Sequence, residues 1–156
     1  MNHHRRILLK STLAASATGM AISAGLLTPK AVLAAWNASA FEAKSVDAAL
    51  TGAFGSTSTT ESDKIKLSAP DVAENGASVT VTVKSSLPKT ESISILVAEN
   101  AQPLTASFDL SPRTEGAITT NIKMGKSSDV IAVVKANGKL YTTKQQVKVT
   151  IGGCGG

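Results

Sequence analysis

Residues 130–141 read Val130-Ile131-Ala132-Val133-Val134-Lys135-Ala136-Asn137-Gly138-Lys139-Leu140-Tyr141. The segment opens with a nearly continuous apolar run, which is typical of a strand at the centre of a sheet. Asn-Gly then predicts a two-residue hairpin turn, because both turn positions require positive φ. A last long strand, residues 140–151, is therefore expected to pair with the apolar run and to carry the chain almost to its end.

Short alternating apolar runs recur upstream of this hairpin, and they are separated by turn signals such as Glu74-Asn75-Gly76, Leu87-Pro88-Lys89 and Ser111-Pro112. The runs place strands near residues 64–68, 79–84, 93–97, 106–110 and 117–124. Seven or so short strands with frequent turns predict an all-β fold, an immunoglobulin-like antiparallel β-sandwich. The Cys-Trp-Cys hallmark of antibody domains is absent, so this likeness concerns architecture alone.

Residues 37–54 are the one good helix candidate. Ser39 is expected to cap the helix at its N-terminus, and Glu42 stands three positions on, as in a capping box. The spacing of apolar residues predicts one face that packs on the domain, made of Phe41, Val46, Ala49, Leu50 and Ala53.

Residues 1–34 have the pattern of an export signal. A basic start with Arg5 and Arg6 precedes an apolar stretch of small residues and an Ala-rich cleavage region at 31–35. The arginine pair, followed by Ile-Leu-Leu-Lys, resembles a twin-arginine signal, and an ordinary secretory signal with a chance arginine pair is the alternative. Both predict delivery to a periplasm, with no membrane segment after cleavage. The remaining chain is then one domain, residues 35–151, followed by a short tail, residues 152–156.

Removal of this signal changes the charge of the chain. The full sequence has 16 Lys and Arg against 11 Asp and Glu, a net charge of +5. Residues 1–34 contain four of the basic residues and no acidic ones, so the exported chain is close to neutral at +1. The lysines of the carboxy-terminal half are expected to lie on a solvated face: Lys123, Lys126, Lys135, Lys139, Lys144 and Lys148. Without a basic stripe or interleaved aromatics, nucleic acid is not an expected partner.

Composition also excludes several kinds of active site. Both histidines, His3 and His4, lie in the signal, and Cys154 is the sole cysteine. Zinc, haem and copper sites of ordinary design therefore have too few ligands, and no Ser-His or Cys-His pair can form. We expect no cofactor, no metal and no catalytic residue of the protein's own. Asp129, after Ser127-Ser128, is interpreted as a turn residue, not as a catalytic acid.

The end of the chain is Ile151-Gly152-Gly153-Cys154-Gly155-Gly156. Glycine lacks Cβ and has wide φ/ψ freedom, so this segment is expected to be a flexible, sterically bare arm. Three residues separate Ile151 from Cys154, which allows a reach of about 10 Å from the last strand. A single thiol on such a tether suits covalent attachment of a substrate that is presented to other proteins.

Several stretches of the sequence resemble the SoxY family, sulfur-substrate carriers of the periplasmic thiosulfate-oxidation system. The most specific stretch is residues 147–156, supported by residues 67–76, 79–83 and 129–134. The chain departs from the family pattern at Asn100-Ala101-Gln102-Pro103, where Asn-Pro-x-Pro is common. It also departs at Thr120-Asn121-Ile122-Lys123-Met124, where Thr-Arg-Ile-Arg-Met is common.

The resemblance implies that Cys154 holds sulfur intermediates covalently. It also implies a smaller β-protein, SoxZ, as heterodimer partner. A haem-containing enzyme would couple thiosulfate to the thiol, a hydrolase would release sulfate, and in some systems a sulfane dehydrogenase would oxidise the remaining sulfur. Such a carrier is a substrate of these enzymes and catalyses nothing itself.

Two other kinds of protein fit parts of this sequence. A ubiquitin-like sulfur carrier also ends in Gly-Gly, but it needs ATP activation, which an exported protein lacks. An exported structural or interaction subunit could use Cys154 for an intermolecular disulfide, since an odd cysteine always permits one.

Overall fold

The hairpin predicted at Asn137-Gly138 is present in the computed structural model, which describes residues 37–150. It joins β8 (Ser128–Ala136) to β9 (Lys139–Val149), and the pairing runs from Ala136↔Lys139 to Ser128↔Val147. Asn137 and Gly138 have φ of 50° and 71°, the left-handed values that a tight hairpin requires. This hairpin therefore sets the register of the two longest described strands.

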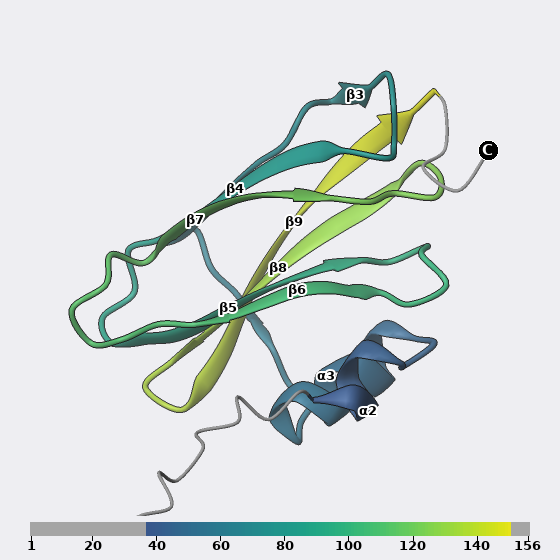
Figure 1. Ribbon diagram of the computed structural model, residues 1–156. Coiled ribbons are helices and arrows are strands. Elements are labelled where there is room, and N and C mark those ends of the chain that lie inside the picture. Colours follow the sequence, from purple (N-terminus) through teal and green to yellow (C-terminus); the bar gives the residue numbers. More distant parts are fainter. Residues whose placement is uncertain (1–36, 151–156) are drawn as a thin grey trace, which may run out of the picture. The chain divides into compact units, whose positions relative to one another are not determined.

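The larger sheet is built around that hairpin (Figure 1). Its strand order is β1-β9-β8-β5-β6, where β5 is Thr90–Val97 and β6 is Leu104–Asp109. The short strands β1 (Thr60–Glu61) and β3 (Val72–Ala73) both pair with β9 in parallel. The sequence predicted neither of these parallel pieces, because a two-residue strand is too short to show alternation.

The second sheet faces this one and contains β2 (Ile65–Ser68), β4 (Val79–Ser85) and β7 (Ala117–Ile122), in the order β2-β4-β7. Alternate residues of β4 point inward: Val79, Val81 and Val83 are buried, and Thr80 between them is exposed. These valines meet Ile93, Ile95 and other apolar side chains of the larger sheet in one core. The prediction of an immunoglobulin-like β-sandwich is confirmed.

The single helix predicted for residues 37–54 is wrong, because the segment forms two short helices, α2 (Ala38–Phe41) and α3 (Val46–Phe54). Ser39 and Glu42 do not form the predicted capping box. The helices are capped instead by the side chains of Asn37 and Ser45. The Asn37 side-chain oxygen accepts a hydrogen bond from the Ala40 N–H, and the Ser45 hydroxyl accepts one from the Ala48 N–H.

Folding into two pieces lets both helices face the sheet. Ala40 of α2 and Ala49 and Leu50 of α3 are buried against Leu96, Leu104, Val133 and Leu140 of the larger sheet. The predicted apolar face is thus confirmed, although it is divided between two helices. The helices cover the outer face of the larger sheet (Figure 1), so its central strands β5 and β8 are buried on both sides. This explains why β8 reads as a continuous apolar run.

Candidate functional site

The residues predicted to carry function lie outside the described part of the chain. These are the thiol Cys154, its neighbours Gly152, Gly153, Gly155 and Gly156, and the signal arginines Arg5 and Arg6. The structure does describe the point from which the tail departs, Thr150 at the end of β9. We call Thr150, together with the segments 70–78, 98–103 and 123–127, the carboxy-terminal rim.

Thr150 is held on one side by the segment that contains β3. Its N–H donates to the Ala73 carbonyl over 3.1 Å, and its hydroxyl donates to the Glu74 carbonyl over 2.8 Å. The Lys148 N–H donates to the Asp71 carbonyl over 2.9 Å, which extends the same parallel ladder. The strand that leads to the tail is therefore bonded up to its last described residue.

The opposite side of the strand end is held by one serine. The Ser127 hydroxyl accepts the Val149 N–H at 2.8 Å, and it lies 3.4 Å from the Val149 carbonyl, a long and weak contact. Ser128 is the first residue of β8, and its pairing with Val147 ends the ladder between β8 and β9 on this side. The Ser127 side chain thus supplies a partner where the main chain of β8 has already turned away.

A third polar side chain closes the gap between β1 and β3 along the edge of β9. The Gln145 amide accepts the Ala69 N–H at 3.2 Å and donates to the Ala69 carbonyl at 2.9 Å. It therefore satisfies a backbone donor and a backbone acceptor, as a neighbouring strand would. Sequence reasoning missed Ser127, Gln145 and Thr150, because nothing local distinguishes them from ordinary surface residues.

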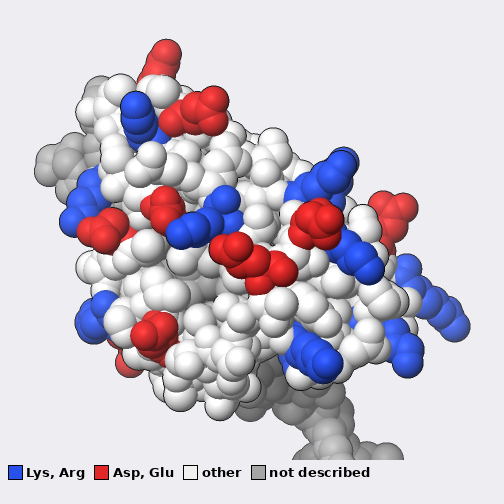
Figure 2. All heavy atoms as spheres, turned by 180° about the vertical axis from the view of Figure 1, so that it is seen from behind, with Lys and Arg blue, Asp and Glu red and all other residues white. Residues whose placement is uncertain are grey.

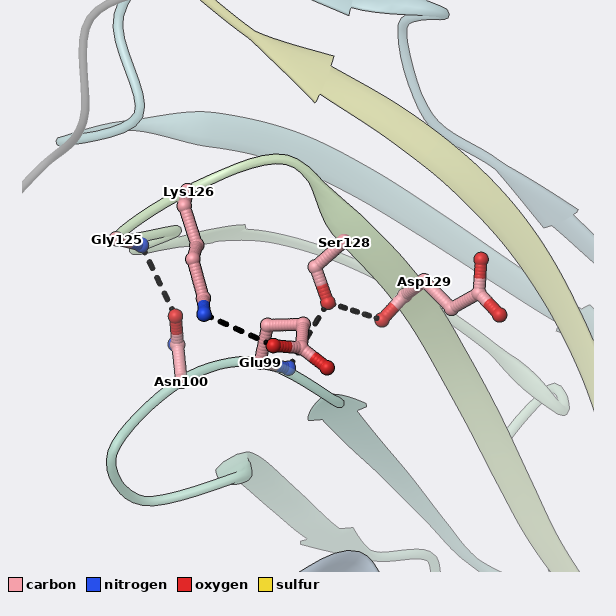
Figure 3. Close-up of polar contacts among 6 residues, drawn as sticks. All are labelled: Glu99, Asn100, Gly125, Lys126, Ser128 and Asp129. Carbon is pink, nitrogen blue, oxygen red and sulfur yellow. Dashed lines mark hydrogen bonds and ion pairs between the residues drawn. The ribbon is translucent and has the colours of Figure 1, made fainter.

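The two other loops of the rim are bonded to each other (Figure 3). The Asn100 side chain donates to the Lys123 carbonyl and accepts the Gly125 N–H, at 2.8 and 2.9 Å. The Ser128 hydroxyl accepts the Glu99 N–H at 3.0 Å, and Glu99 pairs with Lys126 at 2.9 Å. The Asn100 side chain therefore serves to lock the loops together.

Between these loops lies an open hollow of about 390 Å³, lined by residues 99–102, Lys123, Gly125 and Lys126. It includes two positions at which the chain departs from the SoxY pattern, Ala101 and Lys123. Its one ion pair, Lys126 with Glu99, is more than half exposed on both sides. Such surface pairs contribute little to stability.

Several of the carboxy-terminal lysines are paired with acids. Besides Lys126, Lys135 lies 3.0 Å from Glu91, and Lys144 lies 3.8 Å from Asp129. On the face shown in Figure 2, basic and acidic side chains are interspersed. The prediction of a solvated face is thus confirmed for these three lysines. The interpretation of Asp129 as a turn residue is wrong, because it is the second residue of β8.

The opposite end of the sandwich has its own polar network, where β5 begins and β8 ends. Glu91 accepts the Gly138 N–H at 2.8 Å and pairs with Lys135. The Gly138 N–H, and then Lys135, hold the pKa of Glu91 below its usual value near 4.5. A hollow of about 580 Å³ lies beside it, and the hydroxyls of Ser85 and Thr90 in its wall bond each other.

Within residues 37–150, no group of three or more Cys, His, Asp or Glu side chains could hold a metal ion. None of the described helices is long and apolar enough to cross a membrane. The described buried side-chain nitrogen and oxygen atoms all have hydrogen-bond partners.

Comparison with protein families finds one match that spans the described sandwich. Residues 50–154 match the family described as "Sulfur oxidation protein SoxY", and the last matched position is Cys154. The chain belongs to the SoxY family. The SoxY match covers the whole of the described sandwich and continues into the tail.

A solved structure agrees with membership in the SoxY family. The sulfur carrier protein SoxY from Chlorobium limicola f thiosulfatophilum is 44% identical, with a TM-score of 0.61 over 67% of this chain and 96% of that chain. The superoxide reductase (neelaredoxin) from Ignicoccus hospitalis is 20% identical, with a TM-score of 0.49 over 55% of this chain and 80% of that chain, a likeness too distant to bear on function. A search of the curated proteins found no match.

Proposed function

We propose that this protein carries sulfur intermediates covalently on Cys154 during thiosulfate oxidation. The observation that carries the proposal is the SoxY match through residue 154, which includes the one cysteine of the chain. The bonded end of β9 supports it, because a firm mount places the start of the tail at a fixed point on the body. The 44% identical protein from Chlorobium is itself described as a sulfur carrier protein.

The proposed loading step joins two sulfur atoms. The Cys154 thiol and thiosulfate form an S–S bond and give a thiosulfonate, Cys–S–S–SO₃⁻. One proton and two electrons are released, and a haem-containing partner enzyme accepts the electrons. A hydrolase then cleaves the bond to the terminal sulfone with water. This step yields sulfate, two protons and the persulfide anion Cys–S–S⁻, and it needs no oxidant.

Activation of the thiol is assigned to the partner enzymes. A free cysteine thiol has a pKa near 8.5, so only a few per cent of it is thiolate at pH 7. A carrier that stays largely protonated between encounters is protected from side reactions. The glycines on either side of Cys154 then allow the thiol to enter a narrow enzyme channel, because they add no side-chain bulk.

The same proposal includes location and partners. Export to the periplasm, directed by the segment with Arg5 and Arg6, would bring the protein to the enzymes of thiosulfate oxidation. We propose a heterodimer with a SoxZ-like β-protein. Transient contacts with the coupling enzyme, the hydrolase and, where one is present, a sulfane dehydrogenase complete the set.

Intact mass of the protein from thiosulfate-grown cells tests the proposal. We expect additions that match sulfur or thiosulfonate, and strong thiol reductant should collapse them to one species. Cys154→Ala should abolish both the additions and the thiosulfate-dependent turnover of the reconstituted system. A homogeneous free thiol would contradict the carrier role. A covalent homodimer as the sole functional form would favour the structural subunit.

A further inference from the structure

Val149 and Thr150, the last two described residues of the chain, lie beyond the ladder of β8 with β9, and Thr150 also lies beyond the ladder of β3 with β9. The pairing of β8 with β9 ends at Ser128↔Val147, and that of β3 with β9 ends at Ala73↔Val149. Beyond the β8 ladder, the Ser127 hydroxyl accepts the Val149 N–H. Beyond the β3 ladder, the Thr150 hydroxyl donates to the Glu74 carbonyl, beside the bond from the Thr150 N–H to the Ala73 carbonyl. We call these two hydroxyls and their partners the strand-end clamp.

Chain ends fray unless they are tied down, so the strand-end clamp sets which residue of β9 is the last one held to the body. With the clamp closed, four residues separate Thr150 from Cys154, an extended reach of about 14 Å. If the end of β9 frayed back to Val147, seven residues would be free, with a reach of about 24 Å. A longer tether spreads the thiol over a larger volume and lowers its effective concentration at a docked partner, by roughly two- to fivefold.

We infer that Thr150 and Ser127 are positioning residues that fix the length and origin of the tether bearing Cys154. This inference rests on the proposed carrier function, since a reach matters only if the thiol is delivered to another protein. The hydroxyls act through the backbone of β9 and touch no substrate. Their loss should therefore change delivery of the thiol while the chemistry at its sulfur stays the same.

Distances between two nitroxide labels test the clamp without any sulfur chemistry. One label is placed on Cys154 and the other on Lys139→Cys, at the exposed first residue of β9 beside the hairpin turn. In the exported protein, Thr150→Val and Ser127→Ala together should broaden the distance distribution and extend it to longer values. Thr150→Ser keeps the hydroxyl and should restore the width. An unchanged width in the double variant would overturn the clamp.

Matched controls separate the clamp from general loss of hydroxyls. Thr119→Val removes a hydroxyl that bonds Thr82 on the smaller sheet, and Ser111→Ala removes one that bonds Thr114 in the loop between β6 and β7. Both should leave the label distances as they are in the unsubstituted protein. Equal broadening in these controls would mean that the effect is not local to the end of β9, and it would also overturn the clamp.

Kinetics with the thiosulfate-coupling enzyme test delivery. The double variant should raise KM for the carrier roughly two- to fivefold and leave kcat within twofold, and Thr150→Ser should rescue KM. Broadened distances with an unchanged KM would contradict the positioning role. If the unsubstituted protein accepts no sulfur at all while the label distances still broaden on substitution, the proposed carrier function fails and the clamp stands.

Discussion

Glu91 joins three parts of the sandwich through a single carboxylate. One oxygen accepts the N–H of Gly138 in the β8–β9 turn, and the other pairs with Lys135 on β8, while Glu91 itself lies on β5. The backbone of the same residue accepts the Leu110 N–H from the end of β6. The Glu91 carboxylate on β5 thus holds the turn of the β8–β9 hairpin in place.

The lowered pKa of Glu91 predicts how stability depends on pH. Because folding favours the charged form, the contribution of Glu91 is complete above its usual pKa near 4.5 and is lost as pH falls through the lower folded pKa. Glu91→Gln should therefore lower the free energy of unfolding at pH 6–8, and the difference from the unsubstituted protein should shrink below pH 4.5. Denaturant titrations between pH 3 and 7 measure it.

Glu115→Gln is the matched control for that titration. Glu115 is exposed and makes no ion pair within residues 37–150. Its substitution should change the free energy of unfolding at pH 7 by no more than about 0.5 kcal/mol. A difference between Glu91→Gln and the unsubstituted protein that stayed constant down to pH 3 would show that the carboxylate charge is not what holds the turn.

At the scale of elements, the two helices depend on one close approach. A Cβ atom on Gly52 of α3 would lie 2.9 Å from both the Cα and the backbone N of Ala40 in α2. Asn37 also donates to the Gly52 carbonyl at 2.7 Å, which ties the start of α2 to α3. Since backbone atoms cannot swing aside, only glycine permits this packing.

Gly52→Ala should therefore destabilise the protein, by about 1–3 kcal/mol, despite the better helix propensity of alanine. The cost arises because α2 must shift away from α3, which loosens Ala40 from the outer face of the sheet. Urea unfolding measures it. Thr51→Ala, at the exposed neighbouring position of the same helix, should change stability by no more than about 0.5 kcal/mol. A Gly52→Ala protein that is more stable than its parent would refute this account of the contact.

The glycines beside Cys154 give a prediction about the tail as an element. Gly153→Val and Gly155→Val each add a stiff, β-branched side chain next to the thiol. Each should slow loading and hydrolysis at least tenfold, about 1.4 kcal/mol of lost transition-state stabilisation, without changing the melting temperature. Reaction with a small maleimide should stay nearly as fast as before. If the partner enzymes turn over both variants normally, threading of the thiol through a narrow channel is excluded.

For the whole molecule, the sequence predicts the sandwich because its central features are local. Asn137-Gly138 demands a hairpin, and the alternating valines of β4 define which face is buried. What it does not predict depends on contacts between distant residues. The covered edge of β9 depends on the bond from Gln145 to Ala69, and the division of the helix goes with the bond from Asn37 to Gly52. Neither feature has a local signal in the sequence. The roles of the thiol and its glycines follow from the order of residues 151–156 and from the resemblance to SoxY, and they remain a prediction.

The resemblance of residues 1–34 to a twin-arginine signal predicts that the domain folds before it is exported. The segment with Arg5 and Arg6 resembles a signal for folded cargo, yet the composition predicts no cofactor that would require folding before export. Transport in complex with a partner that lacks its own signal would explain this. Arg5→Lys with Arg6→Lys keeps the charge of the signal and should leave both proteins in the cytoplasm.

Fractionation with antibodies against each protein measures where the two accumulate. Lys10→Gln changes the charge of the same segment without touching the arginine pair, and it should leave both proteins in the periplasm. If the partner reaches the periplasm while this chain is retained, the two do not travel together. If the doubly substituted chain is exported normally, the pair of arginines is a chance feature of an ordinary secretory signal. The domain then has to fold after crossing, and the heterodimer can form only in the periplasm.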